Sequence, residues 1–233
     1  MEDYHFLESI KNDVLDTYLE HGWYRMGNLV FTTDMLSPRE GGLVHPVFWL
    51  RYRVYDIVLK GSSKKIYDNA RKYEVNYKNF ELTDEIIDLH KRYHNSVNFI
   101  TSDNLQKLLV DVNNAVYDSK LIEIRDNGKL VAAGILDVGK ATAAGIINIF
   151  DPEYKKISPG KMLMLMKYKY CHEHNIPMYY PGYYSPTYSA FDYKLFIDED
   201  ATEVMIPGIY TWVPYKRFKG FISGAFTKNI EEE

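Results

Sequence analysis

Apolar side chains recur every three or four residues in several stretches of this chain, which is the spacing of an amphipathic helix. The pattern predicts helices over residues 3–21, 83–98, 102–112 and 158–175, and a short helix or turn over 66–71. A glycine ends the first of these stretches, and a threonine followed by two acidic residues begins the second. The chain is therefore expected to contain at least four helices.

Runs rich in β-branched and aromatic residues separate these stretches and predict strands. The expected strands are residues 28–32, 45–59, 121–125, 129–138, 143–150, 177–184, 201–206 and 209–213. Asn127-Gly128 joins two of them as a two-residue hairpin turn. The order of elements indicates a mixed α/β (α+β) fold, with a largely antiparallel sheet, flanking helices and one parallel pair around the helix at 158–175. Residues 1–75 are expected to form an N-terminal lobe packed on a domain of residues 76–233.

Composition restricts the class of protein further. The 233 residues are 46% apolar and 26% charged, an ordinary globular balance, and no apolar run is long enough to cross a membrane. The acidic start lacks the plan of a signal peptide, and Cys171 is the single cysteine, so we expect a cytoplasmic protein without disulfides or a cysteine metal site. The net charge of −4 argues weakly against a protein that coats nucleic acid, although residues 51–72 carry seven basic groups against two acidic ones.

The turn from the strand at 143–150 into the next helix concentrates basic groups. Lys155, Lys156 and Lys161 surround a helix start at which Ser158 is expected to be the N-cap. Free backbone N–H groups at a helix start favour an anion, so a phosphate would suit this place, whereas a well-capped helix with surface lysines is an equally good interpretation. Asp151 is expected to cap the strand end.

Tyrosines cluster shortly afterwards. In an alternating strand Tyr179 and Tyr183 share one face, and Tyr180 and Tyr184 share the other. One pair could stack on a base or a ribose, although packing alone would also explain tyrosines in a strand.

Other kinds of site find little support in the sequence. His90 and His94 share a helix face, but no third metal ligand is evident, so no metal is expected. The sequence also shows no nucleophilic triad.

The ordered motifs resemble the arginyl-tRNA–protein transferases and their bacterial leucyl-transferring relatives. The resemblance covers roughly residues 15–195 and depends on the order of short motifs that are each weak alone. These motifs are Gly22-Trp23-Tyr24-Arg25-Met26-Gly27, Thr83-x-Glu85 leading to Lys91-Arg92-Tyr93-His94, Ile149-Phe150-Asp151-Pro152, Ser158-Pro159-Gly160, Tyr180-Pro181-Gly182-Tyr183-Tyr184 and Phe191-Asp192-Tyr193-Lys194.

Two departures from the family pattern stand out. The family carries cysteines soon after its Gly-Trp motif, and the matching residues 34–54 contain none. The family's Lys-Met-x-Tyr-Lys also changes, because Ala190 and Phe191 replace its first two residues.

The resemblance implies a GCN5-related acyltransferase-like fold and an enzyme that moves an aminoacyl group, arginine or leucine, from tRNA to the N-terminal amine of an acceptor protein. No cofactor is implied. On this basis Lys155, Lys156 and Ser158 would face tRNA phosphates, and Gly182, Tyr183 and Tyr184 would line the aminoacyl or terminal-adenosine pocket. Trp23 and Arg25 would recognise an acidic acceptor terminus, while Tyr193 and Lys194 would be catalytic.

Two alternatives stay open at this point. An acyl-CoA-dependent N-acyltransferase would need the turn at 155–161 to cradle a pyrophosphate, but Pro159 removes a backbone donor there. A non-catalytic binding protein derived from the transferases would explain the missing cysteines.

Overall fold

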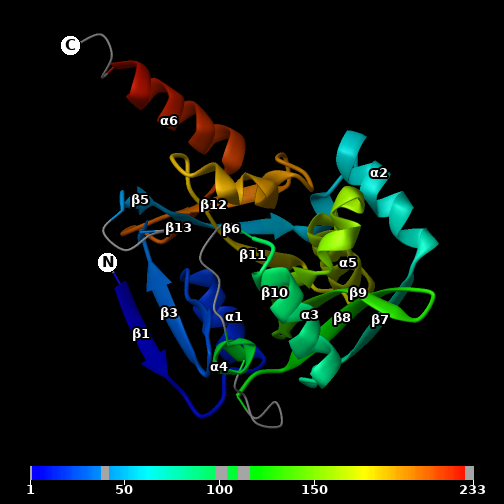
Figure 1. Ribbon diagram of the computed structural model, residues 1–233. Helices are drawn as coiled ribbons and strands as arrows, with labels where there is room; N and C mark the ends of the chain where they lie inside the picture. The colour runs from blue at the N-terminus through cyan, green and yellow to red at the C-terminus, as the bar shows by residue number, and fades with distance from the viewer. Residues whose placement is uncertain (1, 38–41, 98–103, 110–115, 229–233) are drawn as a thin grey trace.

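A mixed sheet of eight strands forms the centre of the computed structural model, which describes residues 2–37, 42–97, 104–109 and 116–228 (Figure 1). Only β10 and β11 pair in parallel, and the other neighbours are antiparallel. In spatial order the strands are β13 (Thr211–Pro214), β12 (Thr202–Ile206), β6 (Phe48–Arg53), β11 (Met178–Tyr184), β10 (Thr142–Phe150), β9 (Lys129–Val138), β8 (Ser119–Asp126) and β7 (Glu74–Asn79). The expected fold class, including the parallel pair, is confirmed.

Helices cover both faces of this sheet, which explains why β9 is almost wholly apolar and buried. On one face α5 (Pro159–Glu173) and α2 (Gly61–Asn69) share a core with β8, β9 and β11. The other face is covered by α1 (Asp13–Glu20), α3 (Asp84–His94) and α4 (Leu105–Leu109). The last helix, α6 (Tyr215–Lys228), extends away from the rest of the molecule (Figure 1).

Local chemistry explains several of these elements. The side chain of Thr83 accepts a hydrogen bond from the Ile86 amide and caps α3, as expected. Asn127 and Gly128 have φ of 49° and 84°, which confirms the hairpin turn between β8 and β9. The helix at 102–112 is observed as α4, and the flanks of the predicted range lie outside the described residues.

The prediction of a helix over 3–21 was wrong in its first half. Residues 2–6 form the strand β1 (Glu2–Phe6), which pairs with β3 (Leu29–Thr33) in a small sheet completed by β2 (Tyr24–Met26). Two further short strands, β4 (Met35–Leu36) and β5 (His45–Pro46), pair with each other. The partner of β1 is distant in sequence, so local periodicity could not reveal it.

Other elements also differ from the predictions. The expected loop at 61–65 is the first turn of α2, and both the edge strand β7 and the helix α6 were not predicted. The long predicted strand at 45–59 is interrupted, because Val54–Asp56 is a 3-10 turn after β6. Among the described residues, none of the helices is both long and apolar enough to span a membrane.

The strand β6 lies between β11 and β12, so residues before and after 75 contribute to one sheet. The division into a lobe of residues 1–75 and a domain of residues 76–233 stays a proposal.

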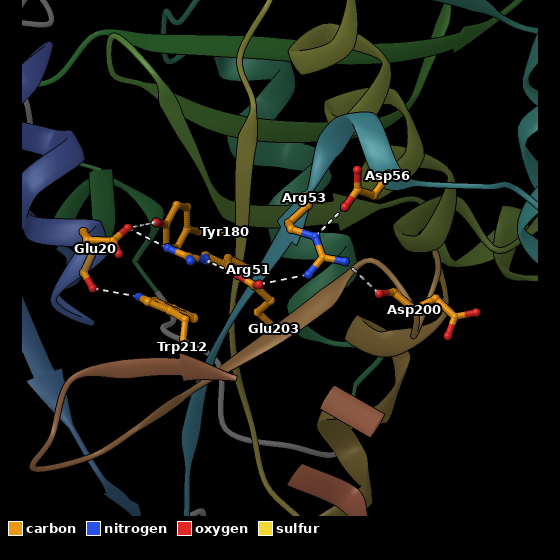
Figure 2. A network of polar contacts seen from close by, with 8 residues as sticks. All are labelled: Glu20, Arg51, Arg53, Asp56, Tyr180, Asp200, Glu203 and Trp212. Carbon is orange, nitrogen blue, oxygen red and sulfur yellow. Dashed lines mark hydrogen bonds and ion pairs between the residues drawn. The ribbon is translucent and has the colours of Figure 1, made fainter. Parts of the chain in front are cut away.

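A network of arginines and carboxylates fixes β6 to its neighbours (Figure 2). Arg51 contacts Glu20 of α1 at 2.6 Å and Glu203 of β12 at 2.7 Å, and Arg53 contacts the other oxygen of Glu203 at 2.9 Å. The Arg51 guanidinium also lies 4.4 Å from the ring centroid of Trp212. These two arginines of the basic stretch at 51–72 therefore hold strands together.

Candidate functional site

The strands β10 and β11 separate after a short parallel ladder. Their pairing spans Thr142–Ala144 and Met178–Tyr180 only, and both strands change register against their outer neighbours just beyond it. A cavity of about 910 Å³ occupies this opening, lined by Gly145–Asn148 on one side and Pro181–Tyr183 on the other. Because the hydrogen-bonded ladder between β10 and β11 ends here, the two strands leave a space between them.

The hydroxyl of Tyr24 spans the place where the two strands separate. It lies 2.7 Å from the carbonyl oxygen of Gly145 on β10 and 2.8 Å from that of Tyr180 on β11. Tyr24 is buried, and its ring stacks on Trp49 at 5.1 Å between centroids. The Tyr24 side chain thus contacts both strands at the start of the opening, from the face of the sheet that α1 covers.

The described walls of the cavity are aromatic and cationic. The lining includes Arg25, Lys155, Lys161 and Lys194, and it contains no carboxylate among the residues that the structure describes. The aromatic members are Tyr24, Phe31, Trp49, Tyr93, Phe150, Tyr179, Tyr183, Tyr188, Phe191 and Tyr193. Such a surface suits a ligand that combines flat rings with negative charge.

The start of α5 forms one edge of the cavity. Ser158 is the N-cap of α5, as expected, but it lies in the left-handed region with φ of 56° and its side chain makes no cap hydrogen bond. Ser158, Lys155 and Lys161 line the cavity together with the first residues of the helix, whereas Lys156 does not belong to the lining. The free amides of this first turn and the two lysines make the edge attractive to an anion.

Asp151 has the expected role at the end of β10, because its side chain accepts a hydrogen bond from the Glu153 amide at 3.1 Å. Lys129 contacts the same carboxylate at 3.1 Å. The turn that carries the cavity lysines is therefore anchored at its start.

Lys194 lines the cavity and is half-buried. Its Nζ donates a hydrogen bond to the Tyr183 carbonyl at 2.9 Å and lies 4.7 Å from the ring centroids of Tyr183 and Phe191. Burial lowers the pKa of Lys194 to about 7, because the surrounding protein disfavours the charged form. Gly182, with φ of 99°, leaves room for this amine, since a Cβ there would lie 3.0 Å from Nζ.

The remaining candidates divide between the cavity and other places. Tyr183 and Tyr193 line the cavity. Tyr184 instead packs edge-to-face on Tyr215 at 5.7 Å, and Trp23 stacks on His5 at 4.2 Å, so neither belongs to the lining. The structure therefore joins the helix start at 158 with the strand at 183, but it leaves Trp23, Lys156 and Tyr184 outside this group.

Arg25 reaches the lining but already has buried partners. Its Nη1 contacts Asp137 at 2.9 Å, and both side chains are almost fully buried. It also donates hydrogen bonds to Ser119 and to the carbonyl of Leu109. Its expected role with an acidic acceptor stays a prediction, and its observed contacts join β2 to β8, β9 and α4.

Sequence reasoning missed several lining residues, among them Tyr24, Trp49, His90 and Asn148 as ligand-facing positions. Tyr24 lies within the Gly-Trp motif, which was the one available signal. The indole nitrogen of Trp49 and the side-chain oxygen of Asn148 are buried and have no hydrogen-bond partner in the described part of the chain. Within that part no group of three or more His, Cys, Asp or Glu could hold a metal ion.

The chain is similar in sequence to proteins named arginyl-tRNA–protein transferase and aspartate/glutamate leucyltransferase. The sequence profile "Arginine-tRNA-protein transferase, C terminus" matches residues 85–199, which include the cavity edges at 145–148, 158–161 and 181–183. An aspartate/glutamate leucyltransferase of Leptospira interrogans is 24% identical over 197 residues, covering 81% of this chain and 74% of that protein. Arginyl-tRNA–protein transferase 2 of Arabidopsis thaliana is 25% identical over 184 residues, covering 68% of this chain and 30% of the plant protein.

FemX aligns with a TM-score of 0.48 and 10% identity, over 82% of this chain and 66% of the FemX chain. The ribosomal-protein-S18-alanine N-acetyltransferase from Escherichia coli aligns with a TM-score of 0.32 and 19% identity, over 44% of this chain and 63% of that chain.

Proposed function

We propose that this chain, a relative of the arginine-tRNA–protein transferases, moves an aminoacyl group from tRNA to the N-terminal amine of an acceptor protein. The observation that carries the proposal is the single cavity between β10 and β11, which joins the lysines at the start of α5 to Tyr183, Tyr193 and Lys194. Most of the residues that line the cavity belong to residues 85–199, the region that the family profile matches.

The chemistry fits these side chains. An aminoacyl ester is already activated, so attack by a neutral amine needs positioning, a proton acceptor and hydrogen bonds to the developing oxyanion. The acceptor amine becomes bonded to the carbonyl carbon, the ester bond to the ribose oxygen breaks, and the proton lost by the amine finally resides on the ribose hydroxyl. No protein nucleophile takes part in this reaction.

Individual roles follow from position. Lys155, Lys161 and Ser158 would face the phosphates of the tRNA acceptor end, and Lys156 would add charge nearby. Tyr183 and the other aromatic rings would stack on the terminal adenosine.

The catalytic roles belong to the other end of the cavity. Lys194, with its lowered pKa, would accept the proton from the attacking amine, and Tyr193 would relay it. The proposed substrate, charged tRNA, also makes the cytoplasm the proposed location.

A transfer assay tests the proposal directly. The protein is incubated with tRNA charged with each amino acid in turn and with a peptide that begins with Asp or Glu. We expect a mass increase of one aminoacyl residue at the peptide N-terminus with at least one charged tRNA. The matched control is the same peptide with an acetylated N-terminus, which should gain nothing. Transfer with none of the charged tRNAs would refute the proposed function.

A further inference from the structure

Tyr179 of β11 lines the cavity, and its hydroxyl makes no hydrogen bond within the described part of the chain. Tyr179 is 1% exposed and stacks on Tyr52 at 5.8 Å between centroids. Its buried neighbours Tyr24, Tyr52 and Tyr180 each donate a hydrogen bond to another protein group. No hydrogen bond of the Tyr179 hydroxyl occurs among the residues that the structure describes. Because Tyr179 lines the cavity, this hydroxyl is available to donate a hydrogen bond to a ligand there.

This hydroxyl lies beside Gly145, at the point where the ladder between β10 and β11 ends. A Cβ at Gly145 would lie 2.7 Å from the Tyr179 hydroxyl oxygen and 3.2 Å from the ring. Gly145 is the first residue of β10 beyond its ladder with β11, and it also lines the cavity. The absence of a side chain at Gly145 therefore lets the Tyr179 ring and hydroxyl pack against the backbone of β10 at the lining of the cavity.

The hydroxyl can act as a donor but not as a base. Burial raises the pKa of Tyr179 well above its ordinary value, so the phenol keeps its proton at neutral pH. A fixed donor in a site that excludes water stabilises an oxygen on which negative charge develops. The attacking amine needs a proton acceptor instead, and the phosphates would be met at the start of α5.

We propose that the Tyr179 hydroxyl donates a hydrogen bond to the carbonyl oxygen of the aminoacyl ester, an inference that rests on the proposed function. When the acceptor amine adds to the ester carbon, the carbonyl π electrons move to this oxygen. When the bond to the ribose oxygen breaks, the carbonyl bond forms again. Tyr179 retains its own proton throughout, so the step requires no additional reactant.

The test compares Tyr179→Phe with Tyr180→Phe, two changes that each remove one hydroxyl from adjacent residues of β11. Tyr180 is not part of the cavity lining, and its hydroxyl contacts Glu20 at 3.2 Å (Figure 2). We expect Tyr179→Phe to lower kcat for transfer about 100-fold, with KM for the aminoacyl-tRNA within about twofold of the wild type. Tyr180→Phe should keep kcat within about threefold.

Stability gives a second, independent measurement. Tyr179→Phe should leave the midpoint of thermal unfolding unchanged or raised, because the lost hydroxyl had no partner in the described chain. A structural role would lower that midpoint instead.

The outcomes separate the two proposals. Transfer by the wild type together with an undiminished kcat for Tyr179→Phe, or a loss expressed only in KM, would overturn the role of Tyr179 and leave the proposed function standing. Absence of transfer by the wild type would overturn both.

Discussion

Aromatic rings surround the amine of Lys194, and this environment determines its chemistry. The rings of Tyr183 and Phe191 both lie 4.7 Å from Nζ, and one hydrogen bond goes to a backbone carbonyl. Neither kind of neighbour compensates for the charge as water would, so the pKa falls to about 7. Near neutral pH a substantial fraction of Lys194 is therefore uncharged and able to accept a proton.

This pKa predicts the pH dependence of transfer. The rate for the wild type should rise as pH increases through about 7, because Lys194 loses its proton there and becomes a base. Lys194→Arg keeps the charge at every accessible pH, so its rate should be lower by about 10²-fold or more and should lack this step. The measurement is the rate under single-turnover conditions between pH 5.5 and 9.

The acceptor peptide also titrates, at about pH 7.7–8.0 for a free α-amine, and this step is common to both enzymes. The control is Lys169→Arg, a half-buried lysine of α5 outside the cavity lining, which should keep the wild-type profile. Identical profiles for Lys194→Arg and the wild type would show that Lys194 is not the proton acceptor.

At the scale of elements, the opening between β10 and β11 exists because neither strand continues the ladder beyond Ala144 and Tyr180. The bulge between Gly145 and Ile147 turns β10 aside, and the register shift between Tyr179 and Gly182 does the same for β11. The Tyr24 hydroxyl then takes the place of the missing ladder hydrogen bonds. The width of the cavity therefore depends on a side chain of β2.

We predict that Tyr24→Phe lowers the free energy of unfolding by about 1–3 kcal/mol, because buried carbonyls lose their shared donor. It should also lower transfer, since the two strands are no longer held at a fixed separation. Chemical denaturation and the transfer assay measure the two effects. Tyr18→Phe is the matched control, because the hydroxyl of Tyr18 contacts the exposed His5 and its loss should change stability by less than about 0.5 kcal/mol. Equal stability of the two variants would contradict the bridging role of Tyr24.

At the scale of the whole molecule, α5 places a second lysine in the core. Lys167 is 0% exposed, and its Nζ donates a hydrogen bond to the Ile147 carbonyl at 3.0 Å. Burial lowers its pKa to about 7, against about 10.4 in an unfolded chain. Between these two values the unfolded state binds one more proton than the folded state, so stability must rise with pH.

The expected slope is about 1.4 kcal/mol per pH unit between pH 7 and 10 for this one group. Lys167→Met removes the titrating group, so the unfolding free energy of that variant should rise less steeply by this amount. Denaturation with urea at several pH values measures both slopes. Lys169→Met, a change on the exposed side of the same helix, should keep the wild-type slope. Parallel curves for Lys167→Met and the wild type would show that Lys167 is not neutral in the core.

Much of the fold could be predicted because its signals are local. The hairpin at Asn127-Gly128, the cap at Thr83 and the order of β10, α5 and β11 depend on turn chemistry and periodicity within short windows. The strand β1 and the place of β6 between β11 and β12 could not be predicted, because a strand's partners are distant in sequence.

The sequence by itself determined the kinds of group near the site: lysines before a helix, a run of tyrosines and a tyrosine–lysine pair, in that order along the chain. Only the tertiary structure decided which of them meet. In the folded protein Tyr179 and Tyr183 line the cavity, Tyr184 packs on Tyr215 of α6, and Arg25 forms an ion pair with Asp137. The physical reason is that a bulge or register shift of one residue changes the face on which a side chain lies, and burial then sets its charge.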